Sequence, residues 1–301
     1  MAVTQTRPVR SDVTTGALSC TAGMTIVGTS VALAPVISGY PVLAGQAWRY
    51  LVAGLILLLA LRLTGRRLGA IPGRHLGRLV LLAATGLAGF NWCLIEGARH
   101  ADPAFLATAV GATPLVLAVA GPISVGSRIR PWTVAGGVIV ATGIVVVQGA
   151  TVAPLAALPY AVGLVLCEAA FTLLAVPLLR IMAPIQLCAA VCLVAVPLLA
   201  ALAVSQPGTD LQLPDAQEAI VLLYMAVLTT AAAFLLWYRG VVRLGADAAG
   251  LFCGVMPVAG VLASMALGTA AWSVSTLGGA ALCAAGLALG LRPSPSRAAQ
   301  I

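Results

Sequence analysis

The sequence predicts an all-α integral membrane protein with ten transmembrane helices, arranged as two inverted five-helix repeats. Three observations lead to this fold class. Of the 301 residues, 61% are hydrophobic and only 8% are charged, with a mean hydropathy of +1.09, which is far from the balance of a soluble domain. The apolar residues form ten runs of membrane-spanning length. The runs in the first half of the chain resemble those in the second half.

The ten runs follow one another along most of the chain, and the connections between them are short and rich in turn-forming residues. A membrane-spanning helix needs about 20 apolar residues. The runs are too long for barrel strands, and apolar and polar residues do not alternate strictly within them. The predicted spans are 17 to 36, 42 to 63, 77 to 96, 102 to 121, 131 to 149, 157 to 177, 185 to 204, 217 to 237, 246 to 267 and 272 to 291.

The arginines indicate how the chain crosses the bilayer, because cytoplasmic loops carry most of the basic residues. If the N-terminus is cytoplasmic, Arg99 is the only arginine on the outer side and Arg49 lies within a span. The tails 1–16 and 292–301 are then both cytoplasmic. The net charge of +8 therefore reflects membrane orientation, not nucleic-acid binding. The use of Arg without Lys is typical of a GC-rich bacterial genome, so we expect the bacterial inner membrane.

Two halves, 17–149 and 157–291, repeat each other in sequence. Because each half has five predicted spans, the second half enters the bilayer from the opposite side. Such inverted repeats are an architecture that secondary transporters use for alternating access. A shift of 143 residues superposes Pro41 on Pro184, Gly97 on Gly240, Gly111 on Gly254, Pro114 on Pro257, Gly136 on Gly279 and Gly143 on Gly286.

Glu168 is a single acid at the centre of the apolar span 157 to 177. It lies about 16 Å from the outer end of that span, close to the bilayer midplane. A carboxylate at this depth costs about 2.5 to 3.5 kcal/mol or more, and such residues face the bundle interior or a cavity. We expect Glu168 either to bind a proton or a cationic substrate group, or to form a neutral hydrogen bond to a neighbouring helix.

Four further side chains join Glu168 as candidates for binding a substrate or a proton. Arg49 keeps its charge inside its span, so we expect it to pair with an acid or with helix-end carbonyls, or to extend to the outer headgroups. Asn91 is the only Asn in the chain, and it is expected in a cavity or in a hydrogen bond between helices. Trp92 and Trp48 are deep enough to form walls of the same cavity.

Four prolines are candidate hinges. Pro114 and Pro257 occupy equivalent places in the two halves, and Pro35 and Pro177 lie at similar places near the ends of the first span of each half. Proline leaves a carbonyl one turn back without its donor and allows the helix to bend. The bends serve either a gating movement or only the packing of the helices.

No metal and no cofactor is expected. All seven cysteines lie in or beside apolar runs, as small core residues do. Cys188 and Cys192 have a spacing that metal ligands use, but His75 and His100 lie in connections and cannot complete such a site.

Several stretches resemble the EamA-type transporters of the drug/metabolite transporter superfamily. In the second helix of that family, an Arg followed by an aromatic residue opens an apolar run, as Arg49 and Tyr50 do here. Relatives often carry a Glu after the Gly that ends the fourth helix of each half, whereas this chain has Ser127 and Thr269 at those places. The similar stretches are 41 to 59, 136 to 147, 228 to 268 and 278 to 290.

The resemblance implies a ten-helix transporter without catalytic chemistry. It implies export of a small organic metabolite, such as an amino acid or a drug-like compound, driven by proton exchange or by the substrate gradient. The expected partners are this small molecule, protons and the lipid bilayer, and the oligomeric state is open. The alternatives are a membrane-embedded lipid-modifying enzyme and a non-transporting membrane subunit.

Overall fold

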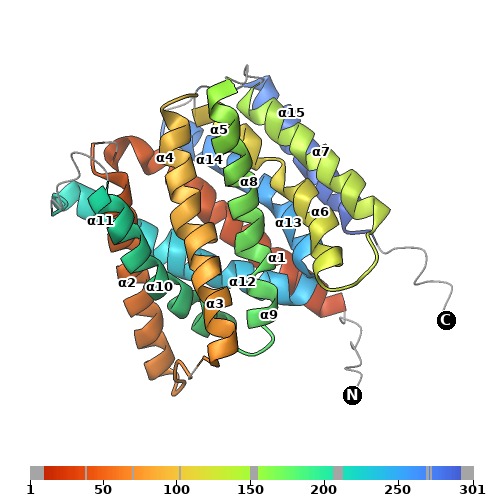
Figure 1. Cartoon of the computed structure of the whole chain (residues 1–301). Coiled ribbons are helices and arrows are strands. Elements are labelled where there is room, and N and C mark those ends of the chain that lie inside the picture. Colours follow the sequence, from red (N-terminus) through yellow and green to blue (C-terminus); the bar gives the residue numbers. More distant parts are fainter. Residues whose placement is uncertain are drawn as a thin grey trace, which may run out of the picture.

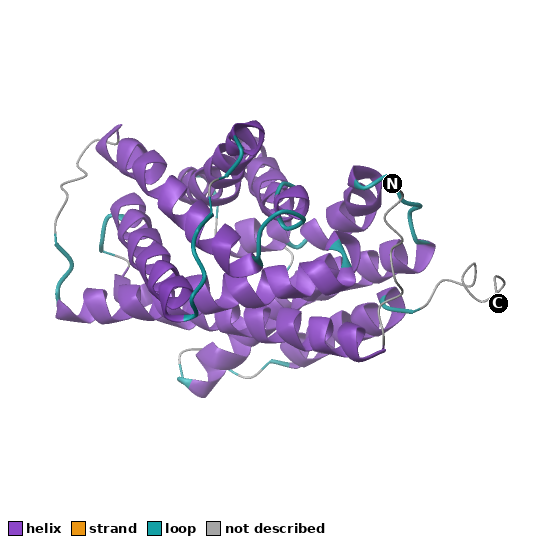
Figure 2. Ribbon diagram, turned by 90° about the horizontal axis from the view of Figure 1, so that it is seen from below, coloured by secondary structure: helices purple, strands orange, loops and turns teal. Residues whose placement is uncertain are grey.

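The computed structural model describes residues 10–37, 39–69, 71–101, 103–149, 155–205, 213–268, 271 and 273–292. Over these residues all regular elements are helices and no strand is found (Figure 2). In chain order the elements are α1 (Arg10–Thr29), η1 (Ser30–Ile37), α2 (Val42–Leu63), α3 (Gly73–Ala83), η2 (Ala84–Gly89), α4 (Phe90–Ala98), α5 (Pro103–Val110), α6 (Thr113–Ser124), α7 (Pro131–Gln148), η3 (Leu155–Ala157), α8 (Leu158–Leu173), α9 (Ala175–Leu178), α10 (Pro184–Ser205), α11 (Ala216–Tyr224), η4 (Met225–Ala232), α12 (Ala233–Leu244), α13 (Ala246–Gly250), η5 (Leu251–Gly254), α14 (Val255–Ala266) and α15 (Val274–Gly290).

The prediction of an all-helical, multi-span membrane protein is confirmed. Among the described residues, eight helical segments are long and apolar enough to cross a membrane, and Val274–Gly290 is a shorter apolar helix. The first segment, α1 with η1, is not among the eight. The eight are Val42–Leu63, Gly73–Ala98, Phe105–Ser124, Pro131–Gln148, Leu155–Leu178, Pro184–Ser205, Ala216–Leu244 and Ala246–Ala266.

Two helices extend beyond the predicted apolar runs. The first begins at Arg10 instead of 17, and the eighth run continues to Leu244 instead of ending at 237. These extensions pack on each other, because a Cβ atom at Gly16 would lie 2.9 Å from Leu244. Hydropathy finds only the part of a helix that suits the bilayer, whereas the hydrogen-bonded turns continue for as long as a neighbouring helix covers them.

The closest packing of two helices is between α7 and α15, which lie side by side in Figure 1. The backbones touch at glycines: a Cβ atom at Gly143 would lie 2.8 Å from the carbonyl oxygen of Gly279, and one at Gly279 would lie 2.6 Å from that of Gly143. Between these contacts, the thiol of Cys283 donates to the carbonyl of Val140 over 3.7 Å. Small residues allow such close approach in membrane proteins.

The other contacts between helices follow one scheme in both halves of the chain. Helix α1 packs against α12 and α14, and α8 packs against α4 and α6. Helix α2 packs along α10, and both lie at one side of the bundle in Figure 1. A shift of 143 residues carries each of the first contacts into the second set, so equivalent segments have equivalent neighbours.

Two π-helical segments, η2 and η4, interrupt the third helix and the eighth. They start at Ala84 and Met225 and end at Gly89 and Ala232, and the ends differ by the same 143 residues as the sequence repeat. The sequence analysis did not predict them. A π-helical turn shifts the backbone hydrogen bonds by one residue, and such turns are frequent at functional sites.

Candidate functional site

Arg49 is a half-buried cation that has only neutral partners among the described residues. Its Nη1 donates to Oε1 of Gln46 over 3.0 Å, and its Nε donates to the hydroxyl of Thr230 in η4. The guanidinium carbon also lies 5.2 Å from the centre of the Tyr50 ring. The acid and the helix-end carbonyls that we expected as partners are not found there. The guanidinium is therefore fixed in position without a counter-charge.

Asn91 lies beside Tyr50, inside the bundle. Its amide nitrogen donates to the carbonyl of Leu87 over 2.7 Å and to the Tyr50 hydroxyl over 3.4 Å. Asn91 is 6% exposed and Tyr50 is 4% exposed. The expected bond between helices is therefore present, since it joins α4 to α2. Asn91 orients the tyrosine that follows Arg49 in the chain.

Glu168 lies in the middle of the buried face of α8. The side chains at three, four and seven residues from it on either side of the helix turn are buried, including Leu164, Phe171 and Ala175, whereas Leu166 on the opposite face is 59% exposed. Glu168 itself is only half-buried. A carboxylate that is more accessible than its neighbours on an inward face borders a space between helices.

Glu168 has no hydrogen bond or ion pair with another described residue, so the expected neutral bond to a neighbouring helix is not found there. The two ion pairs among the described residues are Arg99–Glu96 and Arg130–Asp247. The carboxylate is within electrostatic reach of Tyr50 and Tyr238. Arg49 is also close to Tyr50, so the unpaired cation and the unpaired acid approach one tyrosine from different halves of the chain.

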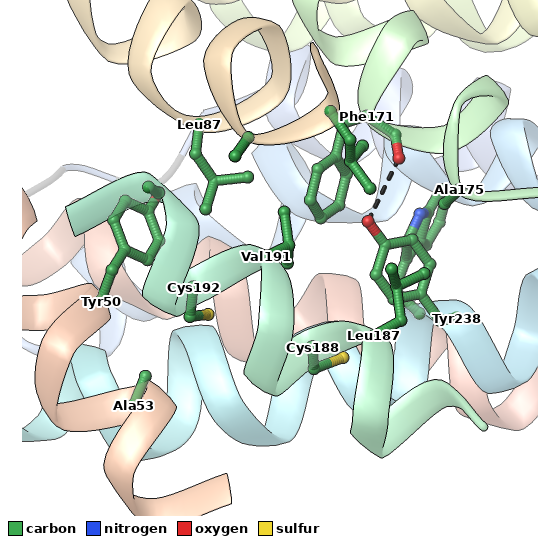
Figure 3. Close-up of a cluster of buried hydrophobic side chains, with 14 of the residues drawn as sticks. Tyr50, Ala53, Leu87, Phe171, Ala175, Leu187, Cys188, Val191, Cys192 and Tyr238 are labelled. Carbon is green, nitrogen blue, oxygen red and sulfur yellow. Dashed lines mark hydrogen bonds between the residues drawn. The ribbon is translucent and has the colours of Figure 1, made fainter. Parts of the chain in front are cut away.

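A row of aromatic rings connects the two sides of this region. Tyr50 lies 6.4 Å from Phe234, Phe234 lies 4.8 Å from Phe171, and Phe171 lies 5.1 Å from Tyr238, measured between ring centres. Figure 3 shows Tyr50 on α2 at one side and Phe171 with Tyr238 at the other, with Leu87, Val191 and Cys192 between them. The hydroxyl of Tyr238 donates to the carbonyl of Phe171 over 3.2 Å, which joins α12 to α8.

The structure does not bring Trp48 or Trp92 to this region. Trp48 is 39% exposed and lies on one stripe of α2 with Leu55 and Leu59, which are 54% and 56% exposed. Trp92 is 38% exposed, and its ring packs edge-on against Tyr160. Both tryptophans follow a candidate residue in the sequence by one position or precede it by one, and a helix turns such neighbours by about 100°.

Each of the four prolines lies beside an interruption of an α-helix. Pro35 is part of η1, where the chain leaves α-helical geometry, and Pro177 is in α9, which follows a break after α8. Pro114 stands in the first turn of α6 after a turn at Gly111. Pro257 lies in the first turn of α14, directly after η5. The positions predicted as hinges thus coincide with discontinuous helices.

Gln46, Tyr50 and Thr230 also belong to the site, although the sequence analysis did not select them as binding residues. Gln46 is 7% exposed and Thr230 is fully buried. A weak signal existed, since Gln46 is polar within an apolar run and Thr230 follows another threonine. Nothing in either run shows that these two side chains, 184 residues apart, face the same guanidinium.

The comparison with protein families now identifies the chain's relatives. The model of the EamA-like transporter family matches residues 14–148 and again residues 155–292. This chain belongs to the EamA-like transporter family. The family favours a membrane transporter over the lipid-modifying enzyme and the non-transporting subunit that the sequence left open.

Two similar proteins agree with this assignment. "Uncharacterized transporter YetK" of Bacillus subtilis (strain 168) is 25% identical over 256 residues, which are 82% of this chain and 78% of that protein. A solved structure described as "Crystal structure of protein" has the same fold, with a TM-score of 0.78 at 21% identity. It covers 91% of this chain and 96% of its own.

One departure from the EamA pattern concerns the end of the fourth helix. Gly126, which is expected to end this helix, has a φ of +69° and follows α6 directly. Ser127 is exposed, and its backbone N–H donates to the carbonyl of Pro122 over 2.9 Å. In this EamA-like chain the position of the family's Glu therefore closes a helix end. Its counterpart Thr269 lies outside the described residues.

An ion pair joins the two regions that the EamA model matches. Nε and Nη2 of Arg130, at the start of α7, both donate to Oδ2 of Asp247 in α13, the first over 3.0 Å. Asp247 also packs against α6, because a Cβ atom at Gly121 would lie 3.0 Å from its backbone nitrogen. The pair is partly buried, with the Arg130 side chain 33% exposed.

The variant Asp247→Asn is expected to lower the free energy of unfolding by about 1 to 2 kcal/mol, because one charged partner of the hydrogen bonds is lost. The melting temperature of the detergent-purified protein measures the effect. Arg130→Gln is expected to cost a similar amount, and the double variant less than the sum. As a control, Glu96→Gln removes the exposed pair with Arg99 and should change little. Additive effects of Asp247→Asn and Arg130→Gln would contradict the coupling.

Proposed function

We propose that this chain is a secondary transporter of the bacterial inner membrane that exports a small zwitterionic metabolite, such as an amino acid. Transport proceeds by alternating access between two inverted five-helix halves, and both termini lie in the cytoplasm. In the proposed site, Arg49 binds the anionic group of the substrate and Glu168 binds the cationic group. Tyr50, held by Asn91, separates the two.

The observation that supports this proposal is a pair of charges without counter-charges. Arg49 has only neutral partners and Glu168 has none among the described residues. A charged side chain within a membrane costs about 2.5 to 3.5 kcal/mol or more, and an arginine cannot avoid this cost by losing its proton. A substrate that carries both charges neutralises both residues at once, and neither an amine nor a carboxylic acid does so alone.

The proposed alternating access is supported by features that recur in the two halves. The family model matches each half separately. The close contacts of α7 with α15 are reciprocal, since Gly143 and Gly279 face each other and are the counterparts of Gly286 and Gly136. The helices are interrupted at Pro114 and Pro257, where a rocking movement of one half against the other needs flexible points.

We further propose that Glu168 couples export to proton entry. A carboxylate that binds a proton cannot at the same time bind a cationic group, so the two compete for Glu168. A proton that enters from outside then releases the substrate, and a substrate from the cytoplasm releases the proton. This exchange uses no other titratable group of the proposed site, because Arg49 keeps its charge.

The test is a counterflow assay with the purified full-length chain in liposomes, using a panel of labelled amino acids. One or more are expected to exchange above the background of empty liposomes, and binding should weaken as the pH falls. Glu168→Gln is expected to lower the rate about tenfold, since a charged hydrogen bond is worth about 1.5 to 3 kcal/mol. The remaining rate should no longer depend on pH in the range where the wild type does.

Glu96→Gln is the matched control, because Glu96 is the same residue type at the end of α4 and already pairs with exposed Arg99. It should transport like the wild type. A Glu168→Gln variant with the rate and pH dependence of the wild type would eliminate the proposed role of Glu168. Exchange of none of the zwitterions, but of a purely apolar compound, would contradict the substrate class.

A further inference from the structure

A cavity of about 620 Å³ lies at the end of α2, far along the chain from the proposed transport site. Its walls combine two kinds of side chain. Apolar carbon comes from leucines, and positive charge comes from three arginines. The lining residues are Leu58, Leu61, Arg62, Gly65, Arg66, Arg67 and Leu68.

The cavity exists because the chain folds back over the end of α2 and is held there. Gly65 has a φ of +68°, and its turn lets the N–H of Arg66 donate to the carbonyl of Leu61 over 2.9 Å. This pattern closes a helix with a glycine in left-handed geometry. Further on, the carbonyl of Arg67 accepts a hydrogen bond of 2.7 Å from the amide of Gln186 in α10. The loop is therefore tied to its own helix and to a second one.

The three guanidinium groups of this cavity have no acid beside them. Arg62, Arg66 and Arg67 are exposed and take part in neither of the two ion pairs among the described residues. Arginine presents a planar fork of donors that matches the oxygens of a phosphate group. Three such groups around one cavity favour a ligand with a phosphate.

We propose that this cavity binds the headgroup of an anionic membrane phospholipid. The choice of a lipid over a soluble phosphate rests on the outer face of α2. Leu55, Leu59 and Leu63 lead along the helix to the cavity and are 54%, 56% and 79% exposed. Because α2 is one of the membrane-spanning candidates, its end lies at the level of the headgroups. The phosphate binds the arginines while the acyl chains lie along the leucines. Basic cavities beside membrane helices bind lipid headgroups in this way.

Native mass spectrometry of the full-length chain in detergent tests the proposal, with dioleoylphosphatidylglycerol and dioleoylphosphatidylcholine as probes. The wild type is expected to retain one phosphatidylglycerol about tenfold more tightly than phosphatidylcholine. The triple variant Arg62→Gln, Arg66→Gln and Arg67→Gln should lose this preference. Leu58→Trp fills the cavity without changing its charge and should also weaken the phosphatidylglycerol complex.

The matched control is a triple Arg→Gln variant at Arg128, Arg239 and Arg292, which are exposed arginines near the ends of other helices. It has the same net charge as the first triple variant and should keep the preference. Equal losses in both triple variants would overturn the site, since binding would then depend on total charge. Unchanged binding in Leu58→Trp would overturn the role of the cavity. Displacement of the lipid by millimolar inorganic phosphate would assign the cavity to a soluble ligand and overturn the lipid proposal.

Discussion

Arg49→Gln is expected to lower zwitterion transport about a hundredfold or more at low substrate concentration. The variant removes the only cation that we place at the substrate and leaves the substrate's carboxylate without a partner in a region of low polarity. Losing one member of a buried, hydrogen-bonded charge pair costs about 2 to 5 kcal/mol, which corresponds to this loss of rate. The counterflow assay in liposomes measures it, using the amino acid that the wild type transports best.

Two comparisons distinguish a binding role of Arg49 from a structural one. Arg49→Lys keeps the charge but loses the fork that donates to Gln46 and Thr230, so part of the rate should return. A simple amine without a carboxylate should bind the wild type and Arg49→Gln equally. Arg99→Gln is the control, because Arg99 is 60% exposed at a helix end. If the amine and the zwitterion lose the same factor in Arg49→Gln, the arginine has only a structural role.

Gly279→Leu is expected to prevent correct folding of most of the protein. The Cβ atom alone would lie 2.6 Å from the carbonyl oxygen of Gly143 and 2.5 Å from Cγ2 of Val147. The backbone oxygen cannot move without separating α7 from α15, so a leucine forces apart the closest pair of helices in the bundle. Overpacking of a core by a few carbon atoms already costs about 1 to 3 kcal/mol. Fluorescence-detected size-exclusion chromatography should show loss of the monodisperse peak.

The neighbouring residue provides the control for this prediction. Gly278 is exposed, and a Cβ atom there would have no neighbour within 4 Å. Gly278→Leu has the same composition as Gly279→Leu and differs by one position on the same helix. It should therefore give a normal peak and a melting temperature close to that of the wild type. Equal behaviour of the two variants would show that the contact between α7 and α15 contributes little to the fold.

The sequence alone predicted the class of the fold and much of its layout. Each predicted apolar run overlaps a helical segment, because the transfer of apolar side chains from water to lipid is a local property of about 20 residues. The inward position of Glu168 was also predictable, since a carboxylate in an apolar run cannot face lipid at low cost. The same argument placed Asn91 inside the bundle.

Other parts of the candidate site were not predictable, because they depend on how each helix is rotated about its axis. Trp48 and Arg49 are adjacent in sequence, yet the first is 39% exposed and the second reaches Thr230 on a distant helix. The π-helical segments depend on the same packing, since they change the rotation partway along a span. Asp247 is another example, because its partner Arg130 lies 117 residues away.

The sequence by itself determined that the chain enters the membrane, where its helices run, and which polar side chains need a protected place. The tertiary structure alone decided that Gln46, Tyr50 and Thr230 surround Arg49, and that neither Arg49 nor Glu168 has a charged partner among the described residues. The reason is physical. Burial in lipid is decided within one helix, whereas the neighbours of a charge are decided by helices that meet only when the bundle packs.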